Sequence, residues 1–113
     1  MVDLFAGLPV TSLTAAVPWY EKLLGEVAFH PNEVEAVFEA AEHRYVYVEQ
    51  KPEIAGHGFV TLFVDDLDAR LAAIADRGLR PESEETYENG VRKTIFRDPD
   101  GNEIGIGGGP VGG

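Results

Sequence analysis

The chain has 113 residues, of which 44% are hydrophobic, and this is enough for one globular domain with a modest core. Its formal charge of −11 argues against binding to nucleic acids or anionic membranes, which attract lysine and arginine, and favours cationic partners. The sequence has no cysteine, no basic start of a secretory signal and no apolar run near the ~18 residues of a membrane span, which together favour a cytoplasmic protein without disulfides.

The first expected element is a half-buried strand over residues 4–10, because every second residue there is aliphatic. One face carries the aliphatic side chains Leu4, Ala6, Leu8 and Val10, and the other carries Phe5, Gly7 and Pro9. Ser12 is suited to cap a following helix, whose apolar positions 13, 17, 20 and 24 have helical spacing and which Gly25 ends. Because Pro18 has no backbone N–H, we expect the first turn of this helix to be offset from the rest.

Three strands are expected after this helix, near residues 26–30, 34–40 and 43–50. Turns at Pro31-Asn32 and Ala41-Glu42 separate them. Residues 51–58, which contain Pro52 and Gly56, form the expected link to the second half of the chain.

The second half repeats this order. A strand near residues 59–64 is followed by a helix that Asp66 or Asp65 caps and Gly78 ends. When the sequence is aligned with itself at a shift of 54 positions, Phe5 falls on Phe59 and the apolar positions of the first helix fall on those of the second. This match indicates an internal repeat. Strands near 83–88, 91–97 and 102–107 follow, with turns at 88–90 and at Asp98-Pro99-Asp100-Gly101. We therefore expect one domain of two modules, about 1–52 and 57–107, with a flexible glycine-rich tail at 108–113.

Three segments also resemble the glyoxalase/bleomycin-resistance/dioxygenase (vicinal oxygen chelate) superfamily. They are TAAVPWYEKLLG at 14–25, FVTLFVDDLDARLAAIADRG at 59–78 and FRDPDGNEIGI at 96–106, in the family's order and spacing. The resemblance implies an α+β fold of two βαβββ modules, whose curved mixed sheets surround a cavity. It also implies a homodimer in which the two chains share cavities. The fold alone does not determine the activity.

Metal-dependent members of this family use histidine and glutamate ligands on the first and last strands of each module. Carried onto this sequence, three of these positions hold Phe5, Phe59 and Gly105, which have no donor atom for a divalent ion. The fourth position lies near Tyr47 or Glu49, and one ligand does not make a site. We therefore predict a member of the family without a metal or other cofactor. An atypical metal site that includes His57 or Glu49 stays open as an alternative.

Strand alternation also predicts which residues line the ligand cavity, because the aliphatic faces should pack against the helices. The predicted cavity residues are Phe5, Tyr45, Tyr47, Glu49, Phe59, Thr61, Phe63, Glu103 and Gly105. Aromatic walls bind flat rings by stacking and cations through the ring quadrupole, and carboxylates at the rim add charge complementarity.

The leading hypothesis is a small-molecule-binding protein, which sequesters a flat cationic compound or antibiotic without catalysis, as bleomycin-resistance-type members do. The alternative is an enzyme of the same superfamily, a glyoxalase-type lyase, isomerase or thiol transferase. Such an enzyme would use a non-standard metal site or acid–base catalysis by Glu49, Glu103 or a histidine. A third possibility is a degenerate subunit that serves only as an interaction partner.

Overall fold

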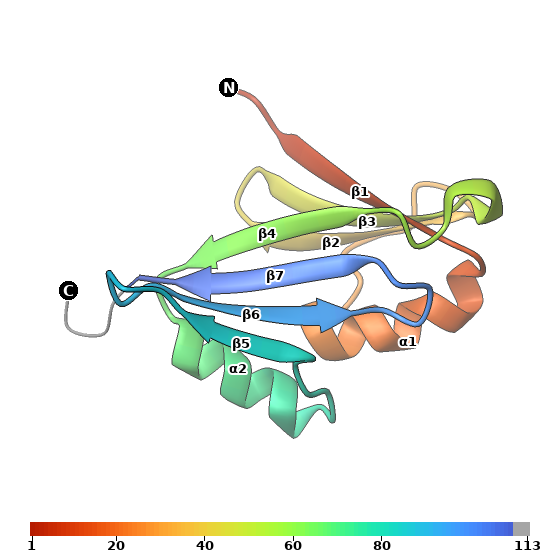
Figure 1. The fold of residues 1–113 in the computed structure, drawn as a ribbon. Coiled ribbons are helices and arrows are strands. Elements are labelled where there is room, and N and C mark those ends of the chain that lie inside the picture. Colours follow the sequence, from red (N-terminus) through yellow and green to blue (C-terminus); the bar gives the residue numbers. More distant parts are fainter. Residues whose placement is uncertain (110–113) are drawn as a thin grey trace.

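The computed structural model describes residues 1–109, which fold into two similar α+β modules (Figure 1). The first module contains β1 (Leu4–Val10), α1 (Leu13–Leu24), β2 (Glu35–Ala41) and β3 (Arg44–Gln50). A short 3-10 helix, Pro52–Ile54, leads to the second module, which contains β4 (Phe59–Val64), α2 (Leu67–Asp76), β5 (Ser83–Thr86), β6 (Arg92–Arg97) and β7 (Glu103–Gly108). The sheet orders are β1-β3-β2 and β4-β7-β6-β5, and in each sheet the first strand runs parallel to the last strand of its module. These findings confirm the predicted fold class.

The strand predicted at 26–30 is wrong, because this segment makes only an isolated bridge between Phe29 and Val37. Pro31 follows directly and has no N–H to continue a ladder. The side chain of Asn32 then accepts a hydrogen bond from the Val34 N–H and turns the chain into β2. The first module therefore has one ladder-forming strand fewer than the second module.

The two helices begin and end close to the predicted residues. The Ser12 hydroxyl accepts a hydrogen bond from the Ala15 N–H at 3.2 Å, as expected for a helix cap. The expected offset at Pro18 is wrong, since α1 continues through this residue without a break. Asp66 occupies the cap position of α2, and its carboxylate instead pairs with the Arg70 Nε at 2.8 Å.

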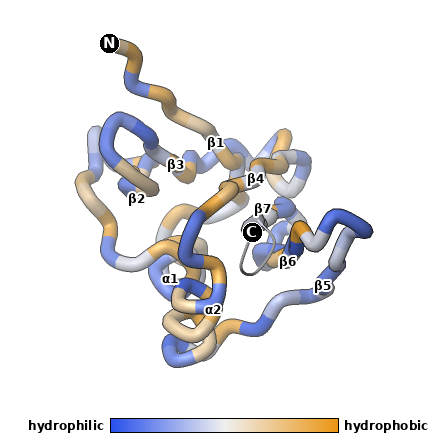
Figure 2. The backbone as a smooth tube through the Cα atoms, turned by 90° about the vertical axis from the view of Figure 1, so that its left-hand side faces the viewer, coloured by the Kyte–Doolittle hydropathy of each residue, from blue (hydrophilic) through white to orange (hydrophobic). Residues whose placement is uncertain are grey.

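Leu4, at the start of the predicted helix-facing side of β1, is 63% exposed, contrary to the prediction. Leu8, Val10 and the aliphatic face of β4 pack with the helices, as predicted, and contribute to one core across both modules. Its most buried side chains include Leu8, Val10, Val46 and Val48 from the first sheet, Phe96, Ile104 and Ile106 from the second, and Tyr20 and Leu23 from α1. In Figure 2 the strands of both sheets form an arch around the two helices, with β1 and β4 near its middle. No ladder joins the two sheets within residues 1–109.

A buried polar cluster in the Asp-Pro-Asp-Gly-Asn turn joins the modules. One oxygen of Asp98 accepts hydrogen bonds from the backbone N–H groups of residues 100, 101 and 102. Its other oxygen accepts from the Tyr20 hydroxyl of α1 at 2.6 Å. Burial, reinforced by this hydrogen bond to Asp98, raises the pKa of Tyr20 above its ordinary value. The phenol therefore stays protonated as a donor to Asp98.

Asn102 continues this cluster to the point where β1 and β4 approach each other. Its Nδ2 donates to the Pro9 carbonyl at 2.6 Å and to the Asp98 carboxylate at 2.8 Å. Its Oδ1 accepts from the Gly58 N–H at 2.7 Å. Asp100 adds a second connection, because its carboxylate accepts from both the N–H and the hydroxyl of Thr11. The turn predicted from sequence is therefore also the junction of the two modules.

β7 continues through Gly108, one residue into the tail predicted at 108–113. The rest of that prediction falls mainly on residues 110–113, which lie outside the described residues. Neither helix in the described part of the chain has the length and apolar character of a membrane span.

Candidate functional site

The nine predicted cavity residues lie on the outer faces of the two sheets, the sides that point away from the helices. Phe5, Tyr45, Tyr47 and Glu49 belong to the first sheet, and Phe59, Thr61, Phe63, Glu103 and Gly105 belong to the second. The parallel register places Phe5 beside Tyr45 and Phe59 beside Glu103. Within residues 1–109 the two groups lie on separate sheets, and no ladder joins these sheets.

The outer face of the first sheet combines three aromatic rings with carboxylates. Phe5 stacks on Tyr45 with ring centroids 4.6 Å apart and an angle of 17° between the planes, and it meets Tyr47 edge-on at 6.4 Å. The strand register adds three acidic residues to this face: Glu35, Glu39 and Glu49. We call these six residues the aromatic–acidic face. One of these glutamates, Glu49, pairs with Lys51, whose Nζ lies 3.9 Å from it.

Gly7 makes room for the Tyr47 ring on the aromatic–acidic face. A Cβ atom at position 7 would lie 2.5–2.9 Å from the ring and hydroxyl atoms of Tyr47. The ring therefore occupies the space of a side chain at position 7, which only glycine leaves free. The sequence places Gly7 on the correct face, and the contact with Tyr47 follows from the β1–β3 register.

The outer face of the second sheet exposes two large aromatic side chains, Phe59 at 80% and Phe63 at 66%. It also carries two cations that the sequence-based prediction missed. Arg97 pairs with Glu103 at 3.3 Å and with Glu82 at 2.9 Å. Glu103, which was predicted as a free carboxylate of the cavity, therefore shares an ion pair with Arg97 in the fold.

The second cation, Lys93, covers the position where metal-dependent relatives would have their final-strand ligand. A Cβ atom on Gly105 would lie 2.8 Å from the Lys93 Cε and 3.0 Å from the Thr61 Oγ1. Alternation along β6 could have indicated Lys93, because residues 93, 95 and 97 share the outer face through their pairing with β7.

The side chains at the metal positions of the family do not fit a metal ion. Phe5 and Phe59 offer no donor atom, and the space at Gly105 is taken by the Lys93 chain. Within residues 1–109, no three histidine or acidic side chains gather closely enough to hold an ion. His57 is exposed in the turn before β4, and His43 pairs with Asp3 at 2.7 Å at the end of the β2–β3 hairpin.

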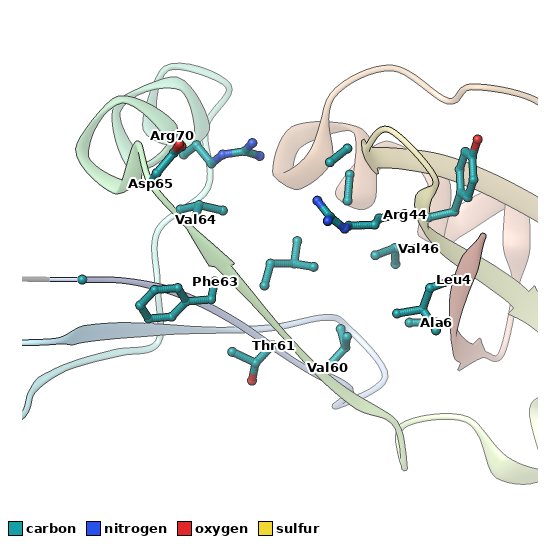
Figure 3. Close-up of a pocket in the computed structure, with 15 residues that line it drawn as sticks. Leu4, Ala6, Arg44, Val46, Val60, Thr61, Phe63, Val64, Asp65 and Arg70 are labelled. Atoms are coloured by element: carbon teal, nitrogen blue, oxygen red, sulfur yellow. The ribbon is translucent and has the colours of Figure 1, made fainter. Parts of the chain in front are cut away.

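A separate cavity of about 930 Å³ opens between the two modules on the helix side of the strands (Figure 3). We call it the notch. Its lining includes Leu4, Ala6, Arg44, Val46, Val60, Leu62, Val64, Asp65 and Arg70. Of the nine predicted residues, only Tyr45, Thr61 and Phe63 border it. The sequence did not predict the notch, because it depends on how the two modules are placed against each other.

Comparisons with known proteins agree with this fold. The family model described as the Glyoxalase/Bleomycin resistance protein/Dioxygenase superfamily matches residues 3–106. A glyoxalase/bleomycin resistance protein from Catenulispora acidiphila is 48% identical, with a TM-score of 0.93 over 97% of this chain and 100% of that chain. A search of curated proteins found no significant match.

Two more distant structures share the fold. A bleomycin resistance determinant encoded on the transposon Tn5 is 17% identical, with a TM-score of 0.77 over 96% of this chain and 98% of that chain. A lactoylglutathione lyase from Agrobacterium tumefaciens is 20% identical, with a TM-score of 0.73 over 97% of this chain and 95% of that chain. The fold therefore occurs both in a resistance determinant and in an enzyme, and the side chains must decide between these functions.

Proposed function

Because the chain belongs to the glyoxalase/bleomycin resistance protein/dioxygenase superfamily, we propose that it binds a small, flat organic cation and sequesters it without chemical change. The observation that carries this proposal is the aromatic–acidic face, where Phe5 and Tyr45 are stacked beside three glutamates. Each aromatic contact with a flat cation contributes about 0.5–2 kcal/mol. Several such contacts and the acidic surroundings would together give a drug-sized ligand useful affinity.

A binding role also agrees with the arrangement of the residues that an enzyme of this family would need for catalysis. The acid–base candidates Glu49 and Glu103 lie on different sheets of the chain, and Glu103 is paired with Arg97. The metal positions Phe5 and Phe59 have no donor atoms. Sequestration needs affinity alone, which the aromatic–acidic face can supply without a catalytic group.

The test is a matched pair of ligands that share one ring system. We expect 1-pyrenemethylammonium to bind saturably and pyrene-1-sulfonate to bind at least about tenfold more weakly, because the glutamates repel the sulfonate. Fluorescence titration would measure both affinities, and mass spectrometry would check that the bound cation is recovered unchanged. Equal affinities for both charges would contradict the proposal, and so would a chemically altered ligand.

Substitutions locate the binding site. We expect Tyr45→Leu to weaken pyrenemethylammonium binding by roughly fivefold or more, because it removes the ring that stacks on Phe5. Gly7→Ala should also weaken binding, since its methyl group displaces the Tyr47 ring. Tyr87→Leu is the control, because Tyr87 is an exposed tyrosine near the β5–β6 turn of the other module. The same loss in all three variants would place the site elsewhere.

We also infer that a second copy of the chain covers the outer faces, because two large aromatic side chains of one strand, Phe59 and Phe63, are exposed on the same face of the second sheet. Sedimentation velocity should then give about twice the chain mass of 12.3 kDa. Phe59→Asp should shift the sedimentation towards the monomer, because it places a charge on this surface. A wild-type monomer at high micromolar concentration would contradict the dimer.

A further inference from the structure

The notch brings together features of both modules that the proposed function does not use. On one side are the helix-facing side chains of β1 and β3, including Leu4, Ala6 and Val46. On the other side are β4 and the start of α2, including Val60 and Leu62. The volume of about 930 Å³ is near the upper end of the range for small-molecule sites. The aromatic–acidic face lies on the other side of the first sheet, and Tyr45 is the one of its six residues that also borders the notch.

Two arginines from different modules converge on this apolar space. Figure 3 shows the guanidinium groups of Arg44, at the start of β3, and Arg70, in α2, pointing towards each other across the notch. Within residues 1–109, Arg44 has no carboxylate within 4.0 Å. Arg70 uses its Nε for Asp66, and its two terminal nitrogens have no acceptor in that part of the chain.

This pair of cations stands out because the chain as a whole is strongly acidic, with 20 acidic and 9 basic residues. Asp65 also lines the notch, and Asp66 already pairs with the Nε of Arg70. Within residues 1–109, the donors left without an acceptor are the terminal nitrogens of Arg70 and the guanidinium group of Arg44. A planar guanidinium group binds carboxylates with two parallel hydrogen bonds, which gives it geometric preference for this anion. The unpaired guanidinium nitrogens of the notch therefore favour a carboxylate ligand, in contrast to the aromatic–acidic face.

We propose that the notch is a second ligand site, which binds an amphiphilic carboxylate. The carboxylate lies between Arg44 and Arg70, and the aliphatic chain lies on the apolar walls of β1 and β4. Charge complementarity selects this class over a neutral or cationic amphiphile. The apolar walls select it over a small inorganic anion, which would leave them in contact with water.

The test uses dodecanoate and dodecyltrimethylammonium, which have the same alkyl chain and opposite charges. Calorimetric titration below the micelle concentration should show one dodecanoate per chain and no saturable binding of the ammonium compound. Arg44→Gln and Arg70→Gln should each weaken dodecanoate binding by roughly tenfold, because each removes a charge-assisted hydrogen-bonding partner. Arg80→Gln is the matched control, since it removes the same charge from an exposed residue outside the notch.

A steric variant tests the apolar part of the site. Ala6→Trp fills the space between the modules and should abolish dodecanoate binding while pyrenemethylammonium binding to the outer face persists. Equal binding of the two amphiphiles would overturn the proposal, as would unchanged affinity in both notch arginine variants. A change from dimer to monomer in Arg44→Gln or Arg70→Gln, with no dodecanoate binding to the parent protein, would assign the notch to a second copy and also overturn it.

Discussion

Gly56→Ala is expected to reduce the free energy of unfolding by about 3 kcal/mol or more, one of the two largest losses that we expect from a single substitution. Gly56 has a φ of +85°, a left-handed conformation that favours glycine. An added Cβ would overlap the carbonyl oxygen of Asp100, which is backbone and cannot rotate away. Relief of this overlap would separate the link between the modules from the Asp98–Asn102 turn. Urea unfolding followed by circular dichroism measures the loss.

Gly78→Ala is the matched control for this substitution. Gly78 has a similar φ of +99°, and a Cβ there would meet no atom within 4 Å. It should therefore lose only about 1 kcal/mol, the backbone cost of a left-handed alanine. The difference between the two variants isolates the steric contact with Asp100. Equal losses would show that the backbone conformation alone explains both effects and that the contact is unimportant.

The fold could be predicted from sequence because its signals are local and occur twice. The alternation around Phe5 recurs around Phe59. Both of these strands, β1 and β4, are followed by a cap residue and a helix of similar length. Alternation also identified which face packs on the helices, since Leu8 and Ile104 are buried while Phe59 is exposed. These features can be predicted from the spacing of the apolar residues and from the turn residues alone.

The candidate site was less accessible to sequence reasoning because it depends on contacts between distant residues. The ion pair between Glu103 and Arg97 follows from the β6–β7 register. The position of Lys93 over Gly105 follows from the direction of the lysine side chain. The notch arginines, Arg44 and Arg70, meet only because the modules are placed side by side (Figure 3). Local periodicity contains no information on such placements.

Asn102→Ala is the second substitution with a large expected effect, a loss of about 3–5 kcal/mol. Asn102 is fully buried and is hydrogen-bonded to Pro9, Gly58 and Asp98 at 2.6–2.8 Å. Alanine would leave the Gly58 N–H without this partner and the Pro9 carbonyl with only the Gly56 N–H at 3.3 Å, and an unsatisfied buried polar group costs about 1–3 kcal/mol. It would also take one of two donors from the buried Asp98 oxygen that Tyr20 contacts. Because a typical domain is stable by only about 5–15 kcal/mol, this variant would be close to unfolding.

Asn32→Ala controls for the loss of an asparagine as such. Asn32 is exposed and its side chain makes two local hydrogen bonds, with Val34 and Glu35, so its loss should cost at most about 1 kcal/mol. Urea unfolding compares both variants with the parent protein. Hydrogen exchange adds a local readout, because the Gly58 amide should lose protection in Asn102→Ala and keep it in Asn32→Ala. If Asn102→Ala unfolded at the parent's urea midpoint with the Gly58 amide still protected, Asn102 would not hold the modules together. Its place in the turn would then be explained by the Asp98 hydrogen bonds alone.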